Sequence, residues 1–423
     1  MKISKLYCHI LLVSIALGGI EHAANAGGFQ SGAPTARALG LGGAATALIG
    51  DQAGVFSNTA SLSFMRGTNL ALGATVTMPE YQFSGVLPST ATSKMNPQSM
   101  FPPSVSLSHT FANGLGIGIS ASIPYQIKTS WGESWVGSPI VISSEIRGVQ
   151  VSPGVAFKIG KNLAAALGFQ ATFVRMDHSR RYGDVPDAQT GIFPTMSMTG
   201  SADVAYGFDI GLMYSPGDAF SLGLALRSKT TAEIINGTVT YTGDIGEPSS
   251  NSGAGTSFAT TLTLPERVRA GFMLRPLDAF LVTGDVEYTR WSGVKGVTIR
   301  LGSPVSTRLI DQSGWKDVLA YRAGVEFTIA DVTLRGGLGV EPSPVPDAEL
   351  RPSLPDASGF RYSVGVGYAV EDGLVLDLGL QVERYADRTI TDSHVLYGTD
   401  KYFNGTYAMS STIFALTLSY SWK

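Results

Sequence analysis

The stretch GFRYSVGVGYAV, residues 359–370, alternates from one residue to the next between large apolar side chains and small or polar ones. As a strand it would carry only Phe, Tyr and Val on one face and Arg, Ser, Gly and Ala on the other, because successive side chains of a β-strand point to opposite sides. A strand of about 9 to 11 residues crosses a bilayer, with its apolar face towards lipid. The stretch therefore predicts one strand of a transmembrane β-barrel.

The same alternation recurs along most of the chain. We count about 14 such segments between Arg66 and Trp422. In the segment 315–330, a slip of one residue would move Arg322 and Glu326 into lipid, at a cost of roughly 2 to 4 kcal/mol for an Arg at the midplane. The segments lie near residues 66–80, 102–111, 114–131, 143–160, 162–181, 200–216, 220–241, 256–276, 278–301, 315–330, 332–343, 359–370, 374–390 and 404–422.

The connections between these segments alternate in kind. Tight turns with Gly, Pro, Asn or Asp are separated by longer polar or Pro-rich loops, such as 179–199, 244–255 and 341–358. Short turns on one rim and long loops on the other are typical of outer-membrane barrels, and an even strand count places both termini at the short-turn rim. The tight turns fall at residues 113–114, 160–162, 216–218, 276–278, 330–331 and 371–373.

The alternative is a soluble β-sandwich or barrel with a polar exterior. It would not need alternation along every strand, nor aromatic residues at strand ends, which are typical of the two membrane interfaces. We therefore predict an all-β fold, a transmembrane antiparallel β-barrel of about 14 strands over residues 66–423. The strand-end aromatics assigned to these interface girdles are Tyr81, Trp131, Trp135, Tyr288, Trp291 and Trp315.

The first 26 residues have the pattern of a secretory signal peptide. Lys2 and Lys5 precede an apolar run over residues 7–20, and Ala24-Asn25-Ala26 forms a cleavage site of small residues. A retained anchor is the alternative, but the run is shorter than the roughly 20 residues of a spanning helix. Since Cys8 is the only cysteine, the exported chain would have no thiol, disulfide or cysteine metal site.

Residues 27–65 differ from everything that follows. They are rich in glycine and alanine, and they are loosely helical with only a thin apolar face. Such a segment is too weak to form a helix on its own, so we expect a small helical hatch inside the lumen of the barrel.

The hatch and several later pieces together resemble the FadL/TodX family of outer-membrane transporters for long-chain fatty acids and other hydrophobic compounds. The hatch departs from the family's usual Asn-Pro-Ala-Gly-Leu at residues 58–62, which read NTASL. The pieces that carry the resemblance are GGFQ at 27–30, VFSNTASL at 55–62, LPERVRAG at 264–271, RWS at 290–292, YRAGVE at 321–326, LRGG at 334–337 and PSPVPD at 342–347.

The resemblance implies a 14-stranded barrel closed by the hatch at its periplasmic end, in the outer membrane of a Gram-negative bacterium. It also implies capture of an apolar substrate among extracellular loops and release into the membrane at an inward kink of the third strand. That strand is 114–131, and its Pro124 cannot donate to a sheet ladder, which predicts a local break. The alternative places Pro124 above the membrane in a frayed strand. The expected gating residues are Pro124, Phe29, Asn58 and Leu62.

Candidate substrate-binding residues are apolar loop side chains, of which methionine suits adaptable binding. The alternative for each is packing within its own loop. Arg267 and Arg269 could hold a carboxylate headgroup, although these arginines, with Arg322 and Arg335, could instead pair with lumen carboxylates and anchor the hatch. The apolar candidates are Ile192, Phe193, Met196, Met198, Met100 and Phe101, together with Leu87 and Met95.

The chain offers little for catalysis. His109, His178 and His394 are scattered, and the sequence contains no G-x-S-x-G elbow, Walker loop or metal-ligand cluster. We expect no enzyme activity, cofactor or metal. The net charge of −3 also offers no basic surface for nucleic acid.

The expected partners are a long-chain fatty acid or other hydrophobic small molecule and outer-membrane lipid. We expect a monomer, because a closed barrel has no sheet edge to pair. Three alternatives to passive uptake stay open: a shuttle or docking protein for secreted proteins, an outer-membrane hydrolase and a diffusion porin.

Overall fold

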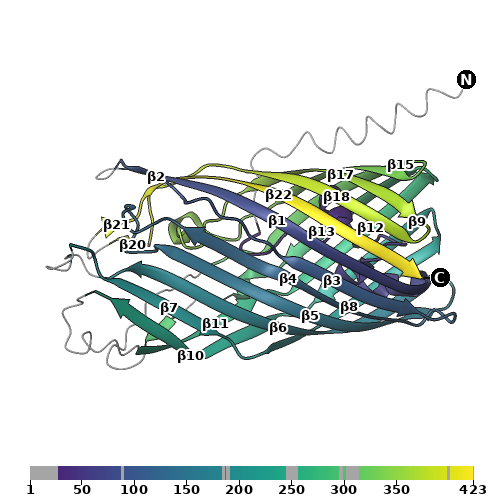
Figure 1. The fold of residues 1–423 in the computed structure, drawn as a ribbon, viewed down its shortest axis with the longest axis horizontal. Helices are drawn as coiled ribbons and strands as arrows, with labels where there is room; N and C mark the ends of the chain where they lie inside the picture. The colour runs from purple at the N-terminus through teal and green to yellow at the C-terminus, as the bar shows by residue number, and fades with distance from the viewer. Residues whose placement is uncertain are drawn as a thin grey trace, which may run out of the picture.

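The computed structural model describes residues 27–86, 90–182, 186, 191–243, 256–294, 299–301, 314–397 and 401–422. The predicted signal peptide and Leu87 lie outside the described residues. The ribbon forms a tilted-strand barrel with its long axis horizontal in Figure 1. Among the described residues, no helix has the length and apolar character needed to cross a membrane.

Within the described part of the chain, twenty strand pieces form one antiparallel sheet. Six barrel strands are each divided into two pieces and eight are undivided, so the twenty pieces make up the fourteen strands that the alternation predicts. The divided spans are β2 (Thr92–Lys94) with β3 (Pro103–Thr110), β7 (Thr195–Ser201) with β8 (Ala205–Gly217), β9 (Phe220–Arg227) with β10 (Thr230–Thr242), β11 (Thr256–Leu264) with β12 (Arg267–Leu277), β13 (Phe280–Thr289) with β14 (Ile299–Leu301), and β18 (Leu374–Tyr385) with β19 (Arg388–Ile390). The undivided spans are β1 (Gly67–Gly85), β4 (Gly116–Ser130), β5 (Ser143–Ile159), β6 (Leu163–Arg181), β15 (Val318–Ile329), β16 (Val332–Glu341), β17 (Gly359–Glu371) and β22 (Gly405–Trp422).

The first and last strands pair with each other and close the sheet. Thr68 of β1 is the register partner of Trp422 in β22, and the pairing continues to Gly85 and Gly405. On its other edge β1 pairs with β3. Both ends of the barrel sequence therefore lie at one rim, as predicted, and the C-terminus is at the right in Figure 1.

The short turns share this rim, and the long loops lie at the opposite one, near β2 and the small hairpin of β20 (Leu396–Tyr397) and β21 (Lys401–Tyr402) (Figure 1). Gly160 and Gly373 have φ of 75° and 84° in the turns after β5 and β17. Only glycine adopts this left-handed conformation without steric cost. The predicted alternation of short turns and long loops is confirmed.

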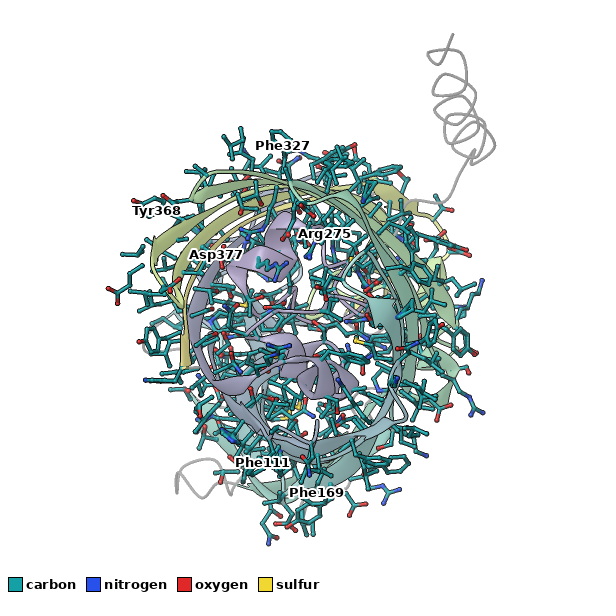
Figure 2. The ribbon with its side chains drawn as sticks, turned by 90° about the vertical axis from the view of Figure 1, so that its right-hand side faces the viewer. Phe111, Phe169, Arg275, Phe327, Tyr368 and Asp377 are labelled. Carbon is teal, nitrogen blue, oxygen red and sulfur yellow. The ribbon has the colours of Figure 1, made fainter. Side chains whose placement is uncertain are left out.

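The predicted inside–outside alternation is also confirmed. On β17, Tyr362 and Val364 are 50% and 58% exposed on the outer surface, whereas Arg322 and Glu326 of β15 are 8% and 6% exposed. Phe327 and Tyr368 point away from the barrel in Figure 2, and Asp377 lies on its inner side. The exposed apolar side chains form a belt that a bilayer would cover.

The assignment of strand-end aromatics to interface girdles is wrong for all four tryptophans. Trp131, Trp135, Trp291 and Trp315 are 3%, 6%, 0% and 4% exposed and belong to the interior cluster. Tyr81 also packs against that cluster, while Tyr288 faces outwards and donates to Asp317 at 2.7 Å. The reason is that segments next to the long loops fold back over the lumen and carry these side chains inwards.

The hatch, residues 27–65, lies inside the ring of strands, where its short helices appear in pale purple in Figure 2. It contains α2 (Ala36–Gly40), η1 (Gly54–Phe56) and η2 (Thr59–Phe64). Thr35 caps α2 by accepting a hydrogen bond from the Ala38 amide, and Asn58 caps η2 in the same way. Two further short turns, η4 (Trp291–Gly293) and η5 (Asp347–Glu349), lie in the long loops.

Candidate functional site

The hatch is attached to the barrel wall through buried polar contacts. Asp285 of β13 accepts hydrogen bonds at 3.0 Å from the amides of Ala45 and Thr46, and at 2.7 Å from the Thr46 hydroxyl. The Asn58 amide group donates to the carbonyls of Thr46 at 3.1 Å and Leu212 at 3.0 Å. These contacts hold the middle of the hatch against two different parts of the wall.

Leu62 secures the end of the hatch near the short-turn rim. Its side chain is fully buried, and its carbonyl accepts a hydrogen bond from the Thr110 hydroxyl at 2.7 Å. A Cβ on Gly116 would lie 2.8 Å from the Leu62 Cβ. The strand β4 can therefore lie this close to the hatch only because residue 116 is glycine.

Two networks of ion pairs lie on the lumen side of the wall. In the first, Glu326 accepts from Arg37 of the hatch and Arg335 of β16, both at 2.8 Å, and Arg335 also donates to Asp377 at 2.6 Å. All four side chains are at most 13% exposed. Arg335 is thus neutralised by the wall, and Arg37 fastens α2 to it.

In the second network, Glu287 and Glu341 share Arg322. Arg322 donates at 3.0 Å to each of them, Glu287 also accepts from Arg269, and Glu341 accepts from Arg361 at 2.8 Å. These arginines are held by carboxylates, as one of the two sequence-based alternatives expects.

Arg267 is different. It is 9% exposed, its Nε atom has no hydrogen-bond partner, and its guanidinium lies 5.6 Å from the centre of the Tyr125 ring. Among the described residues no carboxylate forms an ion pair with it. Arg267 is therefore a buried cation in the lumen that can still accept an anionic partner.

The second network borders a lumen cavity of about 170 Å³ at the start of the hatch. Five arginines and three glutamates line it, beside apolar side chains that include Met100, Ile123 and Ile127. The surplus of cations suits a ligand with a negative headgroup and an apolar body. The charged residues are Arg227, Arg267, Arg269, Arg322, Arg361, Glu287, Glu341 and Glu383.

The break predicted at Pro124 is present. The register of β4 against β5 shifts between Ser122 and Tyr125, so that two residues of β4 lie opposite one residue of β5. On its other edge, β4 pairs with β3 only as far as Ala121. The wall therefore lacks the ladder of hydrogen bonds between β3 and β4 beyond Ala121, next to Pro124.

The start of the hatch occupies this break. The Ser31 amide donates to the Pro124 carbonyl at 2.9 Å, and the Gln126 amide donates to the Phe29 carbonyl at 3.1 Å. Gln30 and Tyr125 form an isolated antiparallel bridge. Hatch residues thus take the hydrogen-bonding positions that β3 leaves empty.

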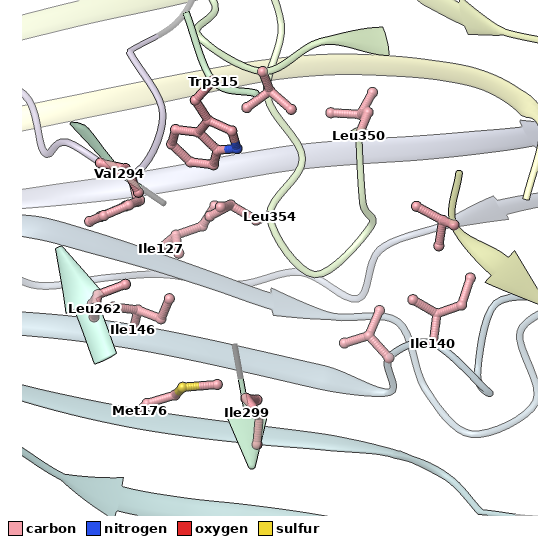
Figure 3. Close-up of a cluster of buried hydrophobic side chains, with 14 of the residues drawn as sticks. Ile127, Ile140, Ile146, Met176, Leu262, Val294, Ile299, Trp315, Leu350 and Leu354 are labelled. Carbon is pink, nitrogen blue, oxygen red and sulfur yellow. The ribbon is translucent and has the colours of Figure 1, made fainter. Parts of the chain in front are cut away.

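Phe29 fills an aromatic pocket formed by Tyr125, Trp291 and Trp315. Its ring centre lies 5.7, 5.3 and 6.2 Å from theirs, and it is 2% exposed. The pocket continues into an apolar cluster that Figure 3 shows in close-up, where Leu354 of the loop between β16 and β17 lies beside Ile127, and Leu350 of the same loop belongs to the same cluster. An apolar interior thus leads from the long loops to the lumen cavity.

The other sequence-predicted residues lie in three places. Met196 and Met198 are buried in the apolar cluster, and Met100 lines the lumen cavity. Ile192 and Phe193 border a second cavity of about 430 Å³ among the long loops, with Trp135 and Arg181 on its other side. Phe193 lies 4.4 Å from the Arg181 guanidinium.

Met95 is also buried in the cluster, whereas Phe101 is 67% exposed and Ile192 is 59% exposed. The sequence reading did not anticipate the pocket of Tyr125, Trp291 and Trp315. Two signals pointed to it: Tyr125 directly follows the strand-breaking Pro124, and Trp291 lies in the RWS piece at 290–292.

The histidines that a hydrolase would require are placed on separate elements. His109 of β3 contacts the Thr68 hydroxyl at 2.9 Å, His178 is buried on β6, and His394 pairs with Glu349 in the long loops at 2.9 Å. In the described part of the chain, no group of three or more potential metal ligands occurs. The absence of enzyme activity stays a prediction.

A family model described as outer membrane protein transport protein (OMPP1/FadL/TodX) matches residues 19–422. The long-chain fatty acid transport protein of Escherichia coli strain K12 is 23% identical over 407 residues, covering 88% of this chain and 90% of that protein. Outer membrane protein P1 of Haemophilus influenzae is 21% identical over 460 aligned positions, covering 96% and 97%.

Solved structures share the fold at lower identity. A Pseudomonas aeruginosa FadL homologue superimposes with a TM-score of 0.81 at 15% identity, covering 94% of this chain and 100% of that one. The toluene transporter TodX of P. putida gives a TM-score of 0.70 at 14% identity, covering 93% and 99%. At these identities the likeness concerns the fold alone.

Proposed function

Because the chain belongs to the OMPP1/FadL/TodX family of outer-membrane transport proteins, we propose that this outer-membrane barrel takes up long-chain fatty acids or other hydrophobic compounds by passive diffusion. No covalent step and no cofactor is required. The substrate moves between apolar sites in series, and the fatty acid class is suggested by the similarity to the long-chain fatty acid transport protein of Escherichia coli.

The path begins at the cavity among the long loops, where Ile192 and Phe193 capture the apolar chain. It continues past Met196 and Met198 in the interior cluster and ends in the lumen cavity. A carboxylate headgroup would be held by Arg267, a lumen arginine with which no described carboxylate forms an ion pair. A charge-assisted hydrogen bond to a guanidinium is about twice as strong as a neutral one. Phe101, which is exposed, and Arg269, which is paired with Glu287, are weaker candidates.

Release is proposed to occur sideways, through the wall at Pro124. The observation that carries this step is the pairing of Phe29 and Ser31 with the interrupted edge of β4. In the described part of the chain, two backbone hydrogen bonds join this segment to β4 and one buried ring holds it in the break, so a substrate that displaces Phe29 from its pocket would also free the opening. Asn58 and Leu62 would keep the rest of the hatch in place and the short-turn end closed.

The test is uptake of labelled oleate by Gram-negative cells that lack their own fatty acid transporter, with and without this protein in the outer membrane. We expect uptake that rises with expression and saturates with substrate. Pro124→Val should change the uptake rate several-fold in a barrel that still assembles. Pro153→Val is the matched control, because Pro153 is an outward-facing strand proline that pairs in register with Ile119.

Two outcomes would contradict the proposal. Unchanged uptake in Pro124→Val and in a chain lacking residues 27–31 would exclude lateral gating. No uptake of oleate or of toluene, with the barrel shown to be folded in the outer membrane, would favour the alternative of a shuttle or docking protein for secreted proteins. Monomeric state and the domain limits, with a signal peptide over 1–26 and the hatch over 27–65, stay predictions that purification of the mature protein would check.

A further inference from the structure

The first residue of the hatch is pressed against a buried carboxylate. Gly27 is buried, and a Cβ placed on it would lie 2.6 Å from the Oε1 atom of Glu341. The next amide, that of Gly28, donates to the Oδ1 atom of Asp356 at 3.3 Å. Two acidic side chains therefore surround the point at which the hatch begins.

Both carboxylates have acceptor capacity to spare. Arg322 and Arg361 both contact Oε2 of Glu341, and among the described residues no hydrogen bond reaches its Oε1 atom. Asp356 is 2% exposed and accepts from the Ser343 hydroxyl, whereas Arg388 donates to its main-chain carbonyl at 2.9 Å rather than to its carboxylate. Burial raises the pKa of Asp356 to about 7, although Ser343, Arg388 and Gly28 act to lower it. A buried carboxylate without an ion pair is costly, so this site favours a further cation.

We propose that the ammonium group created by signal peptide cleavage after Ala26 is that cation, held at the Gly27 nitrogen by Glu341 and Asp356. The inference rests on the predicted cleavage and not on the nature of the substrate. In the uncleaved chain the same nitrogen is a neutral amide, with one N–H and no charge. Cleavage therefore both frees this end and supplies the charge that the two carboxylates attract.

The geometry suits such a contact. The Gly27 nitrogen is bonded to the same Cα as the hypothetical Cβ, and a free end can rotate about the bond between Cα and the carbonyl carbon. Rotation brings the nitrogen to the position where a Cβ would lie. A separation of 2.6 Å from Glu341 Oε1 is too short for a methyl group, but it is close to the roughly 2.7 to 2.9 Å of a charge-assisted N–H···O bond.

The contact would link maturation to closure of the wall. Only Gly28 separates Gly27 from Phe29, which fills the aromatic pocket, and the bridge of Gln30 to Tyr125 follows directly. An anchored Gly27 limits how far this segment can leave the break at Pro124. The precursor lacks the ammonium group, so its hatch would be less firmly seated.

The experiment is acetylation of the folded, purified mature protein with N-hydroxysuccinimidyl acetate at pH 7, followed by denaturation, trypsin digestion and mass spectrometry. The peptide that ends at Arg37 reads GGFQSGAPTAR and contains no lysine. Its acetylation therefore reports the terminal amine alone. We expect labelling at least about 10-fold slower than in the urea-unfolded protein, because a rise of one unit in the pKa of an amine lowers its neutral, reactive fraction tenfold.

Variants separate the ion pair from simple burial. Glu341→Gln keeps the size of the side chain and removes its charge, and it should raise the labelling rate several-fold. Asp356→Asn should do the same without touching Arg322 or Arg361, which covers the case that Glu341→Gln fails to fold. Glu371→Gln, at an exposed turn on the short-turn rim, is the matched control and should leave the rate unchanged.

Three results would overturn the proposal. The mature chain could start at a residue other than Gly27, the folded protein could label as fast as the unfolded one, or both acidic variants, shown folded by their mobility on unheated gels, could stay as protected as the wild type. Oleate uptake is measured separately. Protection of the terminal amine without oleate uptake would therefore support the ammonium contact and contradict only the proposed substrate.

Discussion

Replacing Asn58 with alanine should loosen the hatch and leave the barrel closed. The Asn58 amide group donates to the carbonyls of Thr46 and Leu212 at 3.1 and 3.0 Å, and its Oδ1 atom caps η2 by accepting from the Ala60 amide at 3.1 Å. A buried hydrogen bond contributes about 1 kcal/mol, and an N-cap contributes about the same. The free energy of local opening should therefore fall by about 3 kcal/mol, which corresponds to roughly a 100-fold larger open population.

Amide hydrogen exchange, followed by mass spectrometry of the protein in detergent micelles, measures this change. Peptides that cover residues 53–65 should exchange about 100-fold faster in Asn58→Ala, whereas peptides from β15 to β17 should not change. Asn113→Ala is the matched control, since Asn113 accepts one hydrogen bond from the Leu115 amide in an exposed turn. Unchanged exchange in residues 53–65 of a folded Asn58→Ala protein would refute the assignment of Asn58 as an anchor of the hatch.

Three further substitutions test other contacts. Glu326→Gln removes the charge that Arg37 and Arg335 share, so exchange in residues 36–41 should rise about 10-fold, as expected for the loss of about 1.5 kcal/mol from charged hydrogen bonds; no rise would place the anchor of α2 elsewhere. Val364→Lys puts a charge on the lipid face of β17 and should lower the free energy of unfolding in vesicles by roughly 2 to 4 kcal/mol; an unchanged free energy of unfolding would show that Val364 does not face lipid. Phe29→Ala empties the aromatic pocket that holds the start of the hatch in the break of β4, so the rate of oleate uptake should change several-fold; an unchanged rate in a folded barrel would show that Phe29 does not hold this segment.

The barrel could be predicted from the sequence because its signals are local. The alternation of side chains has a period of two residues, and it placed Arg322 and Glu326 in the lumen without knowledge of their partners. Turn residues marked both rims in the same way. Pro124 could be interpreted alone as well, since the missing N–H is a property of the residue and not of its surroundings.

The partners of lumen side chains could not be predicted in this way, and Arg267 and Arg269 illustrate the reason. They lie two residues apart on the same face of β12, yet only Arg269 is the register partner of Glu287, while Arg267 lies opposite Thr289. Which arginine is neutralised depends on the pairing of two strands. No local pattern reports that register.

The sequence by itself determined the strand order, the inward and outward faces, the two rims and the interruption of β4, because each follows from the geometry of one strand or one turn. Only the tertiary structure decided that Trp291 and Trp315 turn inwards to enclose Phe29, and that Phe29 and Ser31 complete the interrupted edge of β4. These contacts join segments that are distant in the chain. They depend on the closed barrel, which brings its opposite walls to a common lumen.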